Sequence, residues 1–313
     1  MSAVVGLVML VGCASGPEVI VKTADGRGLS AEDVDRQPRA LLPGGGFAWA
    51  HVDVVAARAS TVGQRLLEWA EARVPVPPEA GFSAQRDLER VLLAAYATQG
   101  LDIAGVATGR FDAERIRAVA ERPPSGATTT VLAASEYAGR TLYTTQGAGF
   151  VVLTPRTLLF GSERSMRRTL DRIEEGRVAD ELPDWARSLL DNPRAHFVTG
   201  FDLVSEPATA SVSRRLGFLR GAEQARLLGN FEPPGLNVAG TITYVDAAAA
   251  AAGAEDLRRG GSNAAVAARL LGLGEPIRKL EARSIESHTE LVVSLDESAL
   301  GKALALLARI ERP

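Results

Sequence analysis

Ala50-His51-Val52-Asp53-Val54 is the stretch that decides the fold, because a comparable apolar strand returns later in the chain as Gly200-Phe201-Asp202-Leu203. Both stretches belong to apolar runs that predict buried strands, over Phe47–Ala56 and Ala195–Leu203. Each strand carries an aspartate near its end and is followed by a segment in which apolar residues recur at helical spacing. The two predicted helices cover Thr61–Arg73 and Val212–Leu228.

Working outward in the first half, a hairpin is predicted from two apolar runs that Gln99-Gly100 separates. Asp112 then caps a helix, and several short strands follow before a second helix that begins at Ser162. The predicted strands are Leu88–Ala97, Ile103–Arg110, Thr128–Ser135, Thr141–Thr145, Gly149–Thr154 and Thr157–Phe160, and the predicted helices are Ala113–Arg122, Ser162–Glu175 and Pro183–Leu190.

The second half repeats this plan. A strand with good alternation is predicted over Leu236–Val245, and Asp246 caps the alanine-rich helix that follows it. A hairpin is predicted from Ile277–Ile285 and Thr289–Leu295, and the final helix runs from Asp296 to Ile310. The two parts of the chain therefore predict the same series of elements.

These patterns predict an α+β fold of two similar halves, each an antiparallel sheet with helices packed on one face. The order of elements is related to that of a ferredoxin-like sandwich without being identical to it. We place the first α+β repeat at residues 46–178, a connector at 179–193 and the second repeat at 194–313. An internal duplication is the simplest explanation of the repeated order.

Composition excludes one broad class of function. The chain has 313 residues, 46% of them apolar, and a formal net charge of −3. Such an apolar content supports a sizeable core, whereas a slightly negative charge does not suit a general nucleic-acid binder, which needs an excess of basic residues. We therefore expect no nucleic-acid partner.

The sole cysteine stands in Leu10-Val11-Gly12-Cys13, at the end of the apolar run Val4–Val11. This sequence resembles the lipobox of bacterial lipoproteins, in which a small apolar triplet precedes a cysteine that becomes the mature N-terminus. The resemblance implies a signal peptide over residues 1–12 and lipidation at Cys13. Residues 13–45 are then predicted to be a lipidated tether, because glycine and proline punctuate them up to Pro43-Gly44-Gly45-Gly46.

The lipobox resemblance implies a location rather than an activity. Acyl chains on Cys13 would anchor the protein to a membrane of the cell envelope, since two or more chains give stable anchoring. By the same resemblance, Ala14 after the cysteine favours the outer membrane, with the protein facing the periplasm. The alternative is that Val4–Val11 is a buried strand and Cys13 a buried core residue. The halves also loosely resemble envelope lipoproteins with a duplicated α+β plan, which implies no activity.

Motifs that carry chemistry are sparse. The three histidines have no partner at metal-ligand spacing and no cofactor motif occurs, so we expect no metal and no cofactor. Ser162 suits a helix N-cap better than a nucleophile. Four residues of the two first strands remain as candidates for a cleft, because charged or titratable groups in apolar strands need partners. They are His51, Asp53, His196 and Asp202.

Three functions remain open on the sequence. The first is a lipid-anchored envelope protein with a non-catalytic binding or scaffolding role, and we favour it because no catalytic signature is present. The second is a hydrolase acting on envelope material, which would need the four candidate residues to meet in one cleft. The third is a carrier of apolar cargo, which would need an apolar cavity between sheet and helices.

Overall fold

The computed structural model describes residues 18–71, 78–97, 101–122, 132–145, 147–204, 216–270 and 275–302. The predicted signal peptide and Cys13 lie outside these residues. Strands of the first part are β1 (Val21–Lys22), β2 (Gly28–Leu29), β3 (Ala48–Asp53), β4 (Leu88–Ala97), β5 (Leu101–Gly109), β6 (Ala133–Tyr137), β7 (Arg140–Thr145), β8 (Ala148–Val152) and β9 (Thr157–Ser162). Strands of the second part are β10 (Phe197–Asp202), β11 (Ala222–Asn230), β12 (Gly235–Tyr244), β13 (Ile277–Ile285) and β14 (His288–Asp296).

Helices connect and cover these strands. The α-helices are α1 (Ala31–Arg36), α2 (Val54–Arg58), α3 (Thr61–Glu71), α4 (Ala84–Asp87), α5 (Ala113–Ala120), α6 (Glu163–Glu174), α7 (Asp184–Leu190) and α9 (Ala247–Leu270). The 3-10 helices are η1 (Pro38–Leu41), η2 (Pro78–Ala80) and η3 (Gly217–Leu219). Residues 297–302 are helical as well, at the start of the predicted final helix.

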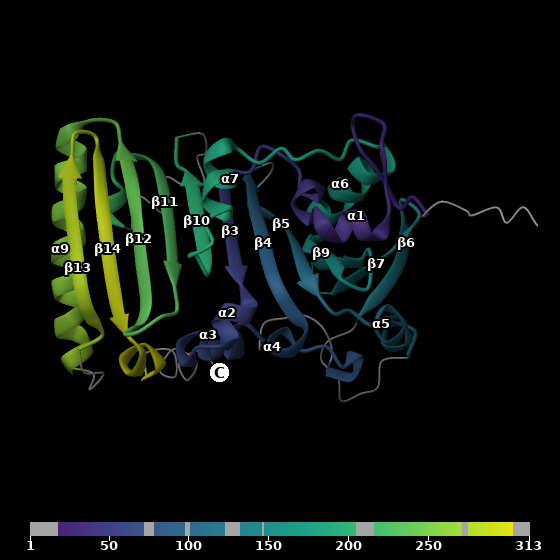
Figure 1. The fold of residues 1–313 in the computed structure, drawn as a ribbon, viewed down its shortest axis with the longest axis horizontal. Helices are drawn as coiled ribbons and strands as arrows, with labels where there is room; N and C mark the ends of the chain where they lie inside the picture. The colour runs from purple at the N-terminus through teal and green to yellow at the C-terminus, as the bar shows by residue number, and fades with distance from the viewer. Residues whose placement is uncertain are drawn as a thin grey trace, which may run out of the picture.

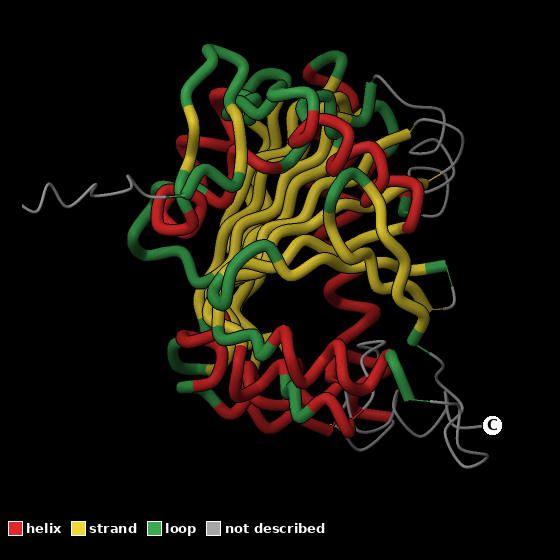
Figure 2. The backbone as a smooth tube through the Cα atoms, turned by 90° about the vertical axis from the view of Figure 1, so that its right-hand side faces the viewer, coloured by secondary structure: helices red, strands yellow, loops and turns green. Residues whose placement is uncertain are grey.

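Strands β3 to β14 form one antiparallel sheet in the order β13-β14-β12-β11-β10-β3-β4-β5-β9-β8-β7-β6 (Figure 1). The α+β class with antiparallel strands is therefore confirmed, and the two halves share a single sheet. Outward from the central β3–β10 pair, β3-β4-β5-β9-β8 and β10-β11-β12-β14-β13 follow the same order. Duplication stays a prediction as the origin of this order. Figure 2 shows the twist of the sheet and a row of helices along its lower rim.

The largest core lies on one face of the first half. It joins Leu92 of β4 and Val106 of β5 to Leu170 of α6. Val34 of α1 and Leu41 of η1 belong to the same core, with 0% and 1% of their surfaces exposed. The prediction of a tether is therefore wrong for residues 18–45: this segment packs onto the sheet because its few apolar residues are spaced to bury one side of α1 and η1.

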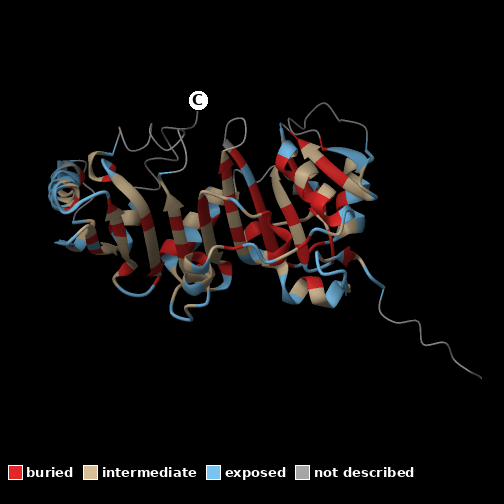
Figure 3. Cartoon of the chain, turned by 90° about the horizontal axis from the view of Figure 1, so that it is seen from above, coloured by how far each residue is buried: buried red, intermediate tan, exposed pale blue. Residues whose placement is uncertain are grey.

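The core of the second half is smaller and joins the sheet to α9. Ile242 and Tyr244 of β12, Leu291 of β14 and Ala250 of α9 are buried together. Small side chains let this helix approach the sheet closely, and the Tyr244 hydroxyl donates a hydrogen bond to the Phe218 carbonyl at 2.6 Å. In Figure 3 the outer side of α9, at the left end, is largely exposed.

These two cores lie on opposite faces of the sheet. Paired residues of neighbouring strands share a face, so the register connects Ala94 through Trp49, Gly200 and Arg226 to Thr241. Ala94 is in the core of the first half. Thr241 is on the same face as Ala94, but it alternates with Ile242 and Tyr244, so the core of the second half lies on the opposite face. Figure 1 is viewed from the side that carries Thr241, and no described helix crosses in front of β14, β12 and β11.

Two predicted elements are corrected. The helix predicted over Val212–Leu228 is replaced, from Ala222 onward, by strand β11; residues 205–215 lie outside the described residues. Ala, Glu, Gln and Leu favour helix in isolation, but pairing of β11 with β10 and β12 outweighs that weak preference. The strand predicted to continue to Ala56 ends at Asp53, whose carboxylate caps α2.

The predicted helix starts are confirmed. Asp112 accepts a hydrogen bond from the Arg115 amide at 2.9 Å, and Ser162 accepts one from the Ser165 amide at 3.2 Å. Asp246 caps α9 in the same way. Each cap satisfies an amide that the first helical turn leaves without a partner.

Candidate binding site

Three of the four candidate residues lie near one end of the β3–β10 pair. The Asp53 carboxylate accepts the Ala56 amide at 2.9 Å, and the Asp53 amide donates to the His196 carbonyl at 2.7 Å. The His196 ring accepts the Phe231 amide through Nδ1 at 3.1 Å. His51 stands two residues before Asp53 on β3. Asp53 and His196 thus have contacts of an ordinary structural kind.

Asp202 lies at the opposite end of the same strand pair. Its amide donates to the Phe47 carbonyl at 2.6 Å, and its carboxylate accepts the Val204 amide at 3.1 Å. Because β3 and β10 are antiparallel, the ends that carry Asp53 and Asp202 point in opposite directions. The four candidates therefore do not converge on one cleft, which was the arrangement that a hydrolase would have needed.

His51 lines a pocket of about 590 Å³ beneath α1 and η1. Burial lowers the pKa of His51 below its usual value; the nearby Asp53 opposes this shift and Arg90 adds to it. The imidazole is therefore held neutral over a wider pH range than usual. Arg39 also lines this pocket and is bound to the connector through Asp180 at 3.0 Å.

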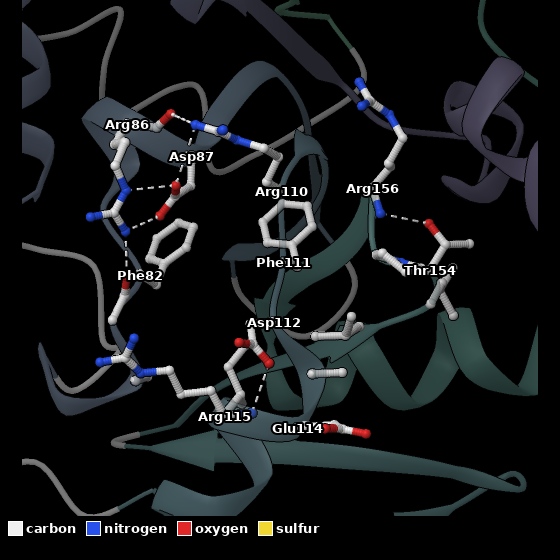
Figure 4. Close-up of a pocket in the computed structure, with 17 residues that line it drawn as sticks. Phe82, Arg86, Asp87, Arg110, Phe111, Asp112, Glu114, Arg115, Thr154 and Arg156 are labelled. Atoms are coloured by element: carbon white, nitrogen blue, oxygen red, sulfur yellow. Dashed lines mark hydrogen bonds and ion pairs between the residues drawn. The ribbon is translucent and has the colours of Figure 1, made fainter.

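A larger pocket, of about 880 Å³, lies on the other side of the β8–β9 turn (Figure 4). Its walls come from η2, α4, the junction between β5 and α5, the first turn of α5 and the β8–β9 turn. The junction is fixed on both sides, because the Arg110 amide donates to the Asp87 carbonyl and the Phe111 amide to the Pro155 carbonyl, each at 2.8 Å. Gly109 is required there: a Cβ would lie 2.0 Å from the Asp87 carbonyl oxygen.

Two phenylalanines give this pocket an apolar side. Phe82 and Phe111 are stacked, with ring centroids 6.0 Å apart and planes inclined by 22°. Phe111 is 5% exposed, and Ile116 of α5, which also lines the pocket, is buried as well. Phe82 is only partly buried, so its ring, supported by Phe111, presents an apolar surface on which a planar group of a ligand can lie.

Arg86 and Asp87 form one wall. The Arg86 guanidinium donates from Nε and Nη2 to the two carboxylate oxygens of Asp87, at 2.9 and 2.6 Å, and also to the Gly81 carbonyl. Asp87 accepts the Ser83 amide as well, at 2.9 Å. Burial alone would raise the pKa of Asp87, but the hydrogen bonds from Arg86 and Ser83 hold that pKa below its usual value. This carboxylate is therefore ionised and fully engaged.

Other arginines of the pocket are less engaged. The Arg110 side chain is 68% exposed, makes one hydrogen bond to the Arg86 carbonyl at 3.2 Å, and lies 3.9 Å from Asp87. Arg115 donates from Nε to the Glu79 carbonyl at 3.3 Å. Arg156, by contrast, is bound to both carboxylate oxygens of Glu89, at 2.9 and 2.7 Å. Arg110 and Arg115 thus keep several N–H groups for a ligand.

The sequence did not indicate this pocket. Its arginines stand at positions 86, 110, 115 and 156, and only the folding of three separate segments brings them together. The one local signal is the sequence Gly109-Arg110-Phe111-Asp112, where a predicted strand meets a capped helix and a large aromatic side chain is placed at the junction.

Comparisons with known proteins concern the fold. No family model matches the chain, and no curated protein matches it in sequence. The structure of TP0453 in crystal form III is similar, with a TM-score of 0.54 and 9% identity over 85% of this chain and 97% of that one. Crystal form I gives a TM-score of 0.51 at 9% identity, over 86% and 96% of the two chains. Crystal form IV gives 0.51 at 8% identity, over 86% and 95%.

Two further observations concern the described residues alone. None of their helices is long and apolar enough to span a membrane. Within the same residues, no three side chains of histidine, cysteine, aspartate or glutamate are grouped so that they could hold a metal ion.

Proposed function

We propose that this protein is a lipid-anchored protein of the cell envelope that binds a ligand without transforming it. The observation that carries the binding role is the pocket of Figure 4, which combines an apolar aromatic surface with arginines that keep free N–H groups. Two of its carboxylates are engaged, Asp87 in an ion pair and Asp112 in a helix cap, and Glu114, which also lines the pocket, points away from the Arg115 guanidinium in Figure 4. Such a set of groups suits recognition of a ligand.

The anchor is the second part of the proposal. Cys13 stands five residues before Glu18, where the described part of the chain begins, and Val21 is already buried in the core. A chain of five residues reaches at most about 18 Å, so acyl chains on Cys13 would hold the folded body close to the membrane surface. The location that we propose is the outer membrane, with the body in the periplasm.

The anchor is tested by expressing the chain in a Gram-negative host and comparing wild type with Cys13→Ala. We expect the wild type alone to gain the mass of acyl chains and to enter the detergent phase on Triton X-114 partitioning. Each methylene of an acyl chain that is buried in the detergent adds about 0.8 kcal/mol to the binding free energy, so a protein with two or more chains partitions almost completely into the detergent phase. Equal mass and equal partitioning of both proteins would remove the anchor from the proposal.

The binding role is tested separately, on the pocket itself. Substitution of Phe82 by alanine removes one of the two stacked rings, whereas Phe201→Ala removes a ring of the same kind from the second half. If the pocket is the binding site, crosslinking to envelope components in cells is lost with the first variant and kept with the second. Equal loss in both variants would assign the effect to stability.

A further inference from the structure

We propose that the pocket of Figure 4 binds a small molecule in which a planar apolar group carries one negative charge. This inference rests on the proposed binding role and names the class of its ligand; it does not depend on the anchor. The volume of about 880 Å³ is within the range of sites for small molecules, which argues for a compact ligand held in a hollow.

The negative charge follows from how the charges of the pocket are already used. Asp87 is bound through both oxygens to Arg86, and Asp112 caps the positive end of α5. Arg156 is neutralised by Glu89 from outside the pocket. Arg110 and Arg115 are left, each with a single hydrogen bond to a carbonyl among the described residues, and Arg110 lies 3.9 Å from the already paired Asp87. The remaining carboxylate of the lining, Glu114, points away from the Arg115 guanidinium in Figure 4. A guanidinium with unused N–H groups is the preferred partner of a carboxylate, phosphate or sulfonate.

The planar group follows from the position of the phenylalanines relative to these arginines. Figure 4 shows Phe82 and Phe111 between Arg110, on one side, and Arg115, on the other. The two rings stack at 6.0 Å and Phe111 is buried, so the partly exposed ring of Phe82 is the flat surface that a ligand can reach beside the guanidinium groups. A ligand with a ring next to its anionic group can contact both features at once, whereas a simple inorganic anion contacts only the arginines.

The experiment uses three probes that separate these features. Naphthalene-1-sulfonate carries both the ring and the charge, naphthalene-1-sulfonamide carries the ring alone, and inorganic sulfate carries the charge alone. Binding is measured by isothermal titration calorimetry on the full chain with Cys13→Ser, so that acyl chains and detergent do not take up the probes. We expect the sulfonate to bind about tenfold or more tightly than the sulfonamide, as a charge-assisted hydrogen bond implies, and sulfate to bind weakest.

Variants then assign the binding to the pocket. Arg110→Gln removes the charge but keeps a polar side chain, and it is expected to weaken binding of the sulfonate about tenfold while leaving binding of the sulfonamide unchanged. The matched control is Arg278→Gln, because Arg278 is also an exposed arginine, 53% exposed, on strand β13 at the far edge of the sheet. Phe82→Leu is expected to weaken both naphthalene probes.

The proposal is overturned if no probe binds, if the sulfonate and the sulfonamide bind equally, or if Arg110→Gln and Arg278→Gln have the same effect. None of these results depends on lipidation, so the anchor stands or falls on the partitioning of wild type against Cys13→Ala. Tight binding of the sulfonate that none of Arg110→Gln, Phe82→Leu and Arg278→Gln weakens would place the binding site elsewhere and would likewise overturn the assignment.

Discussion

The two halves of the sheet follow one strand order but bury their faces differently, because the first half has a core on each face and the core under α9 in the second half lies on one face only. In the first half, α6 and the N-terminal segment with α1 and η1 cover the face that carries Ala94. The other face is covered by α5 in the first half and by α9 in the second half, whereas no described helix lies over β12 and β14 on the face that carries Thr241. Strand order alone therefore does not decide where a helix packs. The choice is made by which alternate residues of each strand are apolar.

The comparison is tested most strongly by placing the same charge at Ala94 and at Thr241, which lie on one face of the sheet. Ala94 is 1% exposed in the core of the first half, so Ala94→Lys buries an unpaired charge and is expected to abolish folding. Thr241 pairs with the exposed Glu290, so Thr241→Lys is expected to change the free energy of unfolding by about 0.5 kcal/mol or less. Soluble yield and circular dichroism distinguish the two, and equal behaviour would refute the assignment of faces.

The next largest effect concerns the N-terminal segment, which covers the first half and has no described counterpart in the second. Leu41→Ala is expected to lower the free energy of unfolding by about 2–5 kcal/mol, because it removes a fully buried side chain from the core. Glu32→Ala, on the exposed side of α1, is the matched control and is expected to have little effect. Urea denaturation measures both. A small loss for Leu41→Ala would mean that the segment is a tether after all.

An intermediate effect concerns two aspartates with lowered pKa values, one in each half. Asp87→Asn is expected to cost about 1–3 kcal/mol at neutral pH, since Arg86 and Ser83 lose a charged acceptor. The pKa of Asp87 in the folded state is below its unfolded value of about 3.9. The contribution of Asp87 to the free energy of unfolding is therefore complete above that pH and is lost as the pH falls below it.

The difference in stability between wild type and Asp87→Asn should therefore shrink in acid. Asp296 of the second half, which is bound to Arg278, should follow the same direction with a smaller amplitude because that pair is on the surface. Urea denaturation at several pH values gives both curves. A difference for Asp87→Asn that stays constant down to pH 3 would contradict the assigned pKa shift.

The smallest effect is expected at the edge of the second half. Arg278→Gln removes an ion pair of 2.6 Å to Asp296, but both partners reach solvent and the pair is screened by salt. We expect a small loss in the free energy of unfolding at low salt, and none at 1 M salt. A larger loss would show that the β13–β14 edge depends on this pair, and thermal denaturation at the two salt concentrations measures it.

Much of the fold was predictable because the signals were local. The hairpin of Leu88–Ala97 with the strand after it, and the helices capped by Asp112 and Ser162, follow from alternation and capping within a few residues. Strand β11 was missed because its residues favour a helix in isolation. The packing of residues 18–45 was missed because a few apolar side chains among many glycines and prolines give a weak pattern, although Leu41 and Val34 are buried completely.

The candidate site was not predictable in the same way. His51 and Asp53 were singled out as unusual residues in apolar strands, and His51 does line a pocket. Apart from the junction Gly109-Arg110-Phe111-Asp112, the arginine and phenylalanine side chains of the larger pocket have no local signal, since an exposed arginine and a buried phenylalanine are ordinary at their positions. What is unusual is that these arginine and phenylalanine side chains line one pocket, around Arg110 and Phe111.

The sequence by itself determined the α+β class, the antiparallel strands, the helix caps and the position of the lipobox-like Cys13, because each of these depends on residues close together in the chain. The tertiary structure alone decided that both halves share one sheet, that the cores of α6 and α9 lie on opposite faces, and that three distant segments enclose a pocket with Arg110 and Arg115. Those features depend on which strand edges pair and which faces are buried. Side-chain periodicity within one strand does not specify its neighbours.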